Sequence, residues 1–284
     1  MALILPYALV ENGQVVANSH PRLRVPWWSF AKTLIAAAVL YEPDLDLDRP
    51  EIEGLSLRHL LANQSGLADY GPLKAYHAAV AQGDQPWSFA EVRRRAGGLV
   101  PLWPPGSDWS YSNVGYGLVV RWLEARHGMD LGGILQQGVL VPEPKSHPDL
   151  ALVPADLQDV EMGADQGYHP GWVYHRLLTG TLSAAALALD GLMEGRLLPK
   201  GRLNKPRDIW PLPLHNRPPW GDAAYGLGVM APALASGQQV IGHTGGGPDS
   251  QISVYWRPGR TVVTFGTGTV GNRVETEAAI RLEA

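Results

Sequence analysis

Cysteine is absent from this chain of 284 residues, which excludes disulfides, thiolate metal sites and a cysteine nucleophile. Charge is also scarce: 18% of the residues are charged, the net charge is −4, and the lysines and arginines are scattered. A nucleic-acid partner is not expected, because clustered basic side chains bind a phosphate backbone. No apolar run approaches the roughly 20 residues that cross a bilayer, so no membrane span is expected. The chemistry must come from hydroxyl, amine, imidazole or carboxylate groups.

The first ten residues are apolar, lack a positively charged start and contain Pro6. Residues 10–15 then read Val-Glu-Asn-Gly-Gln-Val, which is typical of a β-hairpin. We interpret this start as the first strand pair rather than as a signal peptide. The interpretation predicts a cytoplasmic protein.

Helices are predicted through the middle of the chain. Residues 29–41 are apolar on almost every side, as in a buried helix. Ser56 and Ser88 are typical helix-start residues. Residues 113–126 carry apolar side chains at helical spacing, and another helix is predicted from Ser183.

Strands are predicted towards the end of the chain. Four short segments separated by turn residues have strand character: 225–230, 239–242, 251–256 and 261–265. A closing helix is predicted over residues 275–282. Residues 141–170 are expected to be irregular with short elements, and the proline-rich residues 206–219 to cross between two lobes.

These patterns predict an α+β fold in which an antiparallel sheet is flanked by helices. The sheet lobe is expected to contain both ends of the chain, residues 1–55 and 215–284. Residues 56–214 are expected to form an inserted, mainly helical lobe with irregular loops. The active site should lie in the crevice between the lobes, a usual place for a ligand. The sequence does not indicate an oligomeric state.

Ser29 and Lys32 are the first candidate catalytic residues. Their spacing places a hydroxyl and an amine on one face of the predicted helix. A serine hydroxyl needs a nearby base to act as a nucleophile. Lys32 can be that base if burial or a nearby cation lowers its pKa from about 10.4. Amides at the start of the helix, including that of Ser29, can stabilise an oxyanion.

Tyr111 and Asn113 are the second pair of candidates. A phenol of pKa about 10 is drawn towards phenolate beside an ammonium or imidazolium group, so Tyr111 is a candidate second base. Asn113 offers an acceptor to Lys32 and a donor to a substrate carbonyl. Taken alone, Tyr111 would be read as a core aromatic residue and Asn113 as a helix cap.

Three motifs in this order resemble those of the serine β-lactamases and penicillin-recognising enzymes, especially their class C-like esterase and D-peptidase branch. The motifs are Ser29-Phe30-Ala31-Lys32 for S-x-x-K, Tyr111-Ser112-Asn113 for Y-x-N, and His243-Thr244-Gly245 for the K-T-G or H-T-G box. Residues 60–67, 104–106, 171–173 and 225–228 are also similar to that branch.

The resemblance implies a β-lactamase/transpeptidase-like fold and an acyl-enzyme on Ser29. It implies that Lys32 and Tyr111 are the base pair. It also implies substrate contacts from Asn113 and from residues 243–245, and a second oxyanion donor from the Gly246 amide.

His243 stands where the lactamases and peptidases of that superfamily have lysine. A histidine of pKa about 6.5 is mostly neutral at pH 7 and holds a substrate carboxylate poorly. The resemblance associates the H-T-G form mainly with esterases. The first hypothesis is therefore a serine esterase acting on small carboxylic esters.

Two other functions are compatible with the same motifs. Within the superfamily, the alternative is a D-amino-acid amidase or peptidase, or a D-Ala-D-Ala carboxypeptidase with weak β-lactam reactivity. From another class, it is an acyl-binding or sensor module with little turnover. In every case the expected partner is a small molecule, an ester or amide for the two enzymes.

Several remaining features carry weaker hypotheses. Trp28 and Trp109 flank the catalytic motifs and are candidate pocket aromatics, although core packing is the commoner role. Residues 266–271 fit G-x-G-x-x-G, but too little chain follows for a dinucleotide-binding unit. The nine histidines show no metal-ligand spacing. We expect neither a metal nor a cofactor.

Overall fold

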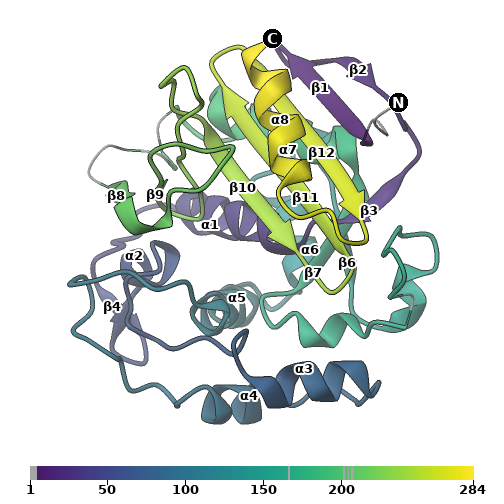
Figure 1. The fold of residues 1–284 in the computed structure, drawn as a ribbon. Helices are drawn as coiled ribbons and strands as arrows, with labels where there is room; N and C mark the ends of the chain where they lie inside the picture. Colours follow the sequence, from purple (N-terminus) through teal and green to yellow (C-terminus); the bar gives the residue numbers. More distant parts are fainter. Residues whose placement is uncertain (1–4, 166, 201, 204, 206–207) are drawn as a thin grey trace.

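The structure is a computed structural model that describes residues 5–165, 167–200, 202–203, 205 and 208–284. A five-stranded antiparallel sheet, ordered β10-β11-β12-β1-β2, forms the upper part of the view in Figure 1. Its strands are β1 (Tyr7–Glu11), β2 (Gln14–Asn18), β10 (Ile241–Gly246), β11 (Ser250–Arg257) and β12 (Arg260–Thr267). The sheet thus joins strands from both ends of the chain.

Turn chemistry sets the register of this sheet. Asn12 and Gly13 have φ values of 50° and 77°, the left-handed pair that a tight hairpin between β1 and β2 requires. Gly259 has a φ of 80° at the turn between β11 and β12. Strand β1 then pairs with β12, with Tyr7 opposite Thr264.

Helices cover both faces of the sheet. Val263 and Val254 belong to the main core, on the side where helix α7 (Leu182–Met193) packs. Their neighbours Val262 and Tyr255 face the opposite way, in a second cluster with helix α8 (Arg273–Glu283). This alternation follows the two-residue period of a strand, and it buries both faces of the sheet.

The remaining helices lie mostly below the sheet in Figure 1. They are α1 (Ala31–Tyr41), α2 (Leu57–Leu61), α3 (Lys74–Ala81), α4 (Phe89–Arg95), α5 (Asn113–His127) and α6 (Leu131–Gln137). The predicted helix starts are confirmed at Ser56 and Ser88, whose side chains accept hydrogen bonds from the amides of His59 and Glu91. Ser112, rather than Asn113, caps α5, because its hydroxyl accepts from the Gly115 amide.

Short elements connect these layers. They are β3 (Arg24–Pro26), β4 (Pro50–Ile52), β5 (Leu55–Ser56), β6 (Asp149–Ala151), β7 (Leu177–Thr181), β8 (Trp210–Pro211), β9 (Ala224–Tyr225), and the 3₁₀ helices η1 (Trp28–Phe30), η2 (Pro144–Ser146), η3 (Pro154–Leu157), η4 (Pro170–Trp172) and η6 (Pro213–His215). The segment 141–170 is irregular with short elements, as predicted. The strand predicted over 225–230 is wrong in extent, since only β9 forms there. Residues 206–207 of the proline-rich segment lie outside the described residues.

Packing crosses the predicted lobe boundaries. Helix α7 lies within residues 56–214, yet it packs on the sheet, while α1 contacts α5 and α6. The division into two lobes at residues 55 and 215 therefore stays a prediction. Among the described residues, no helix has both the length and the apolar character needed to cross a membrane.

Candidate active site

Ser29 lies in the turn that connects β3 to the buried helix α1. The preceding residue, Trp28, has a φ of 42°, a left-handed conformation that is unusual for a bulky side chain. The Trp28 indole N–H donates to the Ser250 hydroxyl at 3.0 Å, which ties this turn to the start of β11. The predicted helix over 29–41 is confirmed, with a first 3₁₀ turn that contains Ser29.

Lys32 is fully buried beneath Ser29. Its Nζ lies 3.0 Å from Ser29 Oγ and donates to Asn113 Oδ1 at 2.7 Å. Burial holds the pKa of Lys32 well below its ordinary value, against the opposing attraction of Asp69. The amine is thereby adapted to accept a proton from Ser29.

Tyr111 meets the same serine from another side. Its hydroxyl interacts with Ser29, which by itself lowers the pKa of Tyr111, and Lys32 Nζ lies 4.9 Å from its ring centroid. Burial, together with Tyr225, raises the pKa of Tyr111 well above 10. The side chain is therefore a neutral phenol, in contrast to the phenolate character expected from the sequence.

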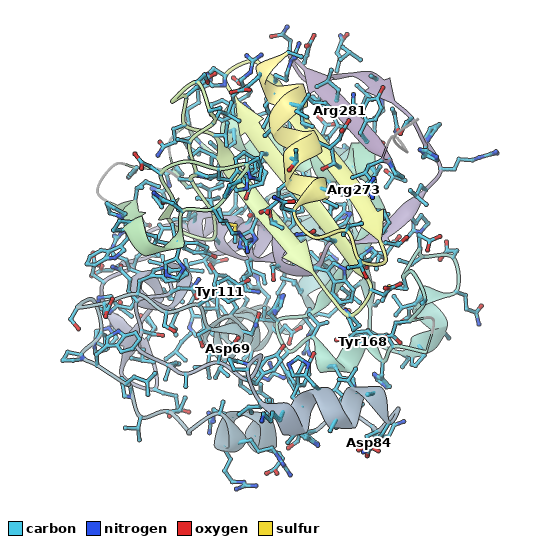
Figure 2. All side chains as sticks on the ribbon, in the orientation of Figure 1. Asp69, Asp84, Tyr111, Tyr168, Arg273 and Arg281 are labelled. Carbon is cyan, nitrogen blue, oxygen red and sulfur yellow. The ribbon has the colours of Figure 1, made fainter. Side chains whose placement is uncertain are left out.

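Asp69 fixes the orientation of Asn113, and sequence reasoning missed it. Its carboxylate accepts from the Asn113 backbone amide at 2.9 Å and from Asn113 Nδ2 at 3.0 Å. The Asn113 Oδ1 atom must then face Lys32. Figure 2 shows Asp69 and Tyr111 in the region between the sheet and helices α3 and α4.

His175 is a second residue that the sequence did not reveal. Its two ring nitrogens lie 3.2 Å and 3.5 Å from Lys32 Nζ, and its side chain is buried. Because the two nitrogens flank one ring carbon, an atom this close to both lies against the face of the imidazole. Burial, and then Lys32, hold the pKa of His175 well below 6.5, so a neutral ring covers the amine.

His243 is buried behind the site rather than exposed to a ligand. Its Nε2 lies 3.2 Å from the Tyr225 hydroxyl, and its Nδ1 lies 2.6 Å from the Thr244 carbonyl oxygen. Burial, followed by nearby Lys32, lowers its pKa to about 3. The ring is neutral, as the sequence predicted, but it lines neither of the two described cavities beside Ser29.

Gly245 of the third motif and Gly247, just beyond the end of β10, let the chain approach the nucleophile. A Cβ atom on Gly245 would lie 2.7 Å from the Ser29 amide nitrogen, and one on Gly247 would lie 2.2 Å from the Trp28 ring. The Gly247 amide donates to the Ser250 carbonyl. Because only every second residue of an antiparallel strand bonds to a given neighbour, Gly246 does not bond to its partner on β11. The Gly246 amide thus points away from β11, consistent with an oxyanion donor beside the Ser29 amide.

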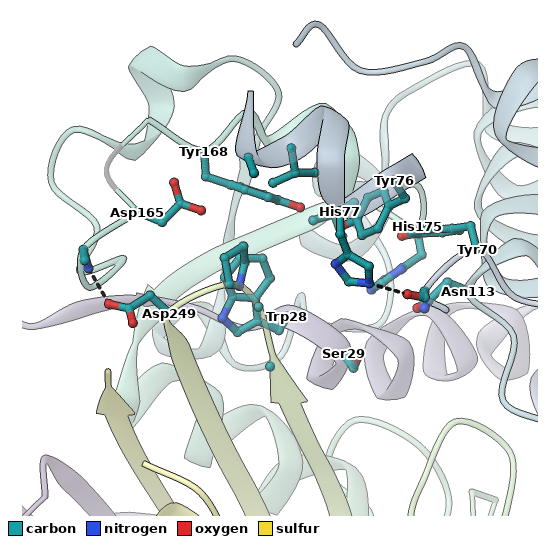
Figure 3. Close-up of a pocket in the computed structure, with 18 residues that line it drawn as sticks. Trp28, Ser29, Tyr70, Tyr76, His77, Asn113, Asp165, Tyr168, His175 and Asp249 are labelled. Atoms are coloured by element: carbon teal, nitrogen blue, oxygen red, sulfur yellow. Dashed lines mark hydrogen bonds between the residues drawn. The ribbon is translucent and has the colours of Figure 1, made fainter. Parts of the chain in front are cut away.

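Two cavities meet at this strand end, and Gly246 lines both. The first has a volume of about 850 Å³ and is lined by Ser29, Asn113 and Trp28. Figure 3 shows it between Asn113 at one end and the carboxylates of Asp165 and Asp249 at the other. The second, of about 670 Å³, is lined by Tyr111, Trp109 and Thr244. Each predicted pocket aromatic therefore lines a cavity.

The described side chains include no cluster of three or more His, Asp or Glu residues suited to a metal ion. The chemical groups around Ser29 are instead the amine of Lys32, which is bonded to the Asn113 amide, and the phenol of Tyr111, with the strand end at Gly246 close by. Such a set can move a proton, form a serine ester and stabilise an oxyanion.

Comparisons with known proteins agree with this geometry. The Beta-lactamase family model matches residues 5–283. A D-aminopeptidase of Cereibacter sphaeroides is 26% identical over 277 residues, which cover 84% of this chain and 51% of that protein. In the curated relatives that match, the aligned part thus reaches at most about half of their length.

Solved structures share the fold. D-amino acid amidase from Ochrobactrum anthropi SV3 aligns with a TM-score of 0.77 at 18% identity, covering 98% of this chain and 94% of that one. A D-stereospecific amidohydrolase from Streptomyces sp. aligns with a TM-score of 0.73 at 20% identity, covering 98% and 94%. At these identities the likeness establishes the architecture, a β-lactamase/transpeptidase-like fold as predicted.

Proposed function

This chain belongs to the Beta-lactamase family, and from that premise we propose that it is a serine hydrolase that cleaves amide derivatives of D-amino acids through an acyl-enzyme on Ser29. The observation that carries the proposal is the buried Lys32 amine, 3.0 Å from Ser29 Oγ. The D-amino-acid class is suggested by the curated relatives, which are D-aminopeptidases.

Acylation begins with proton transfer from Ser29 Oγ to Lys32 Nζ. Lys32 is the better base, because burial favours its neutral amine while it opposes ionisation of Tyr111. The serine oxygen attacks the carbonyl carbon, and the Ser29 and Gly246 amides bind the resulting oxyanion. Asp69 and Asn113 keep the amine aligned during this transfer.

Expulsion of the leaving group requires a proton on its nitrogen. Tyr111 is a neutral phenol that interacts with Ser29, so its hydroxyl can protonate that nitrogen as the carbon–nitrogen bond breaks. The proton that Lys32 accepted then passes to the Tyr111 phenolate, so that the amine and the phenol are both neutral again. Water then cleaves the serine ester, and the reversed transfers restore the site.

The esterase hypothesis rested on His243, and the structure places that ring out of contact with either cavity. The relatives' activity supports the amidase alternative instead. An ester would pass through the same acyl-enzyme, with an alcohol as the leaving group. Relative turnover of matched esters and amides therefore separates the two functions.

The test uses D-alanine amide, L-alanine amide and p-nitrophenyl acetate, with product formation and intact mass measured for each. We expect turnover of the D-amide above that of the L-amide, and an acyl adduct that disappears in Ser29→Ala. Ser107→Ala, which changes an exposed serine bonded to the Pro104 carbonyl, is the matched control. Turnover of the acetate without any of the amides would favour an esterase, and no adduct with any donor would favour a binding module.

A further inference from the structure

The proposed mechanism directs the leaving group towards the second cavity. Tyr111, the proposed proton donor to the leaving group, lines this cavity and does not line the first. Asn113, whose amide faces Lys32, lines only the first cavity. In the proposed mechanism the acyl group therefore lies in the first cavity, shown in Figure 3, and the leaving group lies in the cavity beside Tyr111.

A carboxylate is built into the leaving-group cavity. Glu275, on helix α8, is 2% exposed, and its Oε1 accepts a hydrogen bond from Thr244 Oγ1 at 2.7 Å. The Thr244 hydroxyl also lies 3.1 Å from the Tyr255 hydroxyl. The third sequence motif is thus bonded directly to an acidic side chain from the C-terminal helix.

Arg217 balances this carboxylate from the solvent side. Its Nη2 lies 3.6 Å from Glu275 Oε2, and its side chain is 67% exposed. Among the described lining residues, Arg217 and Glu275 are the charged side chains, and His215 is the one imidazole. The guanidinium is therefore already paired with Glu275, which weakens its attraction for an incoming anion.

We propose that the Glu275–Arg217 pair makes the enzyme select uncharged leaving groups and discriminate against those that carry a carboxylate. This inference rests on the proposed acyl transfer at Ser29 and names its leaving-group class: ammonia, amines and the amides of amino acids. A terminal carboxylate entering beside Thr244 meets the negative charge of Glu275, and the neutral His243 behind that strand provides no cation.

The test compares two substrates that differ only in the leaving group, D-alanyl-glycinamide and D-alanyl-glycine. The readout is the ratio of their kcat/KM values, amide over acid, at pH 7. We expect a ratio above one for the wild type. Glu275→Gln should lower this ratio about tenfold, because Arg217 is then free to pair with the carboxylate.

Arg217→Ala should raise the same ratio, since it leaves the carboxylate of Glu275 unopposed. Arg217 is exposed, so this variant keeps the inference testable if Glu275→Gln does not fold. Glu277→Gln is the matched control, because its carboxylate is paired with Arg281 on the same helix and does not line the cavity. An unchanged ratio in Arg217→Ala, or in a folded Glu275→Gln, would overturn the inference.

A second substrate pair separates this inference from the amidase proposal. Phenyl acetate and 3-carboxyphenyl acetate also differ by one carboxylate in the leaving group, but their acyl group is not an amino acid. If the wild type cleaves only these esters, the amidase proposal fails, while the variants still report on the leaving-group cavity. Ratios that move in the stated directions with the esters support the inference, and static ratios refute it.

Discussion

Replacement of His175 by alanine should change the pH dependence of the enzyme. The imidazole lies against Lys32 Nζ, with both ring nitrogens within 3.5 Å, and helps to keep water from the amine. Without the ring, water can reach the amine and solvate its charged form. The pKa of Lys32 should therefore rise towards its ordinary value.

The size of this effect follows from what remains around the amine. Burial is the main cause of the lowered pKa of Lys32. The rings of Tyr111 and Tyr116, whose centroids lie 4.9 Å and 5.4 Å from Nζ, stay in place, so only part of the desolvation is lost. We expect a rise of about one pKa unit, or about 1.4 kcal/mol in the balance between the two protonation states.

The sign of the change in activity follows from the proposed role of Lys32 as the base. The neutral amine is the active form, so kcat/KM rises as the pH passes upward through the pKa of Lys32. A higher pKa moves this acid limb of the profile to higher pH. Below the limb, His175→Ala should lose about tenfold in kcat/KM, and well above it the loss from this cause should vanish.

The assay is the pH profile of kcat/KM with p-nitrophenyl acetate, which has no titrating group. His175→Phe restores a ring over the amine and should keep the limb near its wild-type position. His77→Ala is the matched control, because His77 lines the same cavity but bonds to the Gly71 carbonyl oxygen. An acid limb of His175→Ala at or below the wild-type pH would refute the reasoning.

Two further substitutions test the supports of the site. Asp69→Asn removes the attraction that raises the pKa of Lys32, so the acid limb should move to lower pH, opposite to His175→Ala. The maximum rate of this variant should also fall, because one bond to Asn113 becomes a donor–donor contact. An upward shift in the pH profile would contradict this. Gly247→Ala places a Cβ atom 2.2 Å from the Trp28 ring, so we expect a loss of about 1–3 kcal/mol in unfolding free energy and lower kcat. Gly167→Ala, which has open space around it, is its control in thermal melts and kinetics. Equal behaviour of the two variants would show that the chain around Gly247 can move away from Trp28.

The local part of the site was predictable from sequence, because spacing on one element determines proximity. Ser29 and Lys32 meet through one helical turn, and Asn113 follows Tyr111 at the start of a helix with a clear apolar period. The same reasoning identified the strands around the third motif. These predictions depend on the spacing of apolar side chains within about a dozen residues.

The supports of the site could not be predicted, because they come from irregular segments. Asp69 follows α2 in a loop, and His175 lies between η4 and β7, so nothing local distinguishes them from other acidic residues or histidines. Their roles depend on where the chain returns in space. The burial of His243 could not be predicted either, because a strand residue can face either the ligand or the core. The substrate preference inferred from His243 assumed that its ring faces the ligand.

The close packing of residues 245–247 against Trp28 and Ser29 holds the proposed nucleophile and the proposed oxyanion donor in one tightly packed unit. Neither can shift without moving the other, so the reacting geometry is insulated from changes elsewhere in the chain. The walls of the two cavities are largely built by other segments, including α3 and residues 212–225. Evolution can therefore exchange those walls and acquire new substrates while the reaction itself is inherited unchanged.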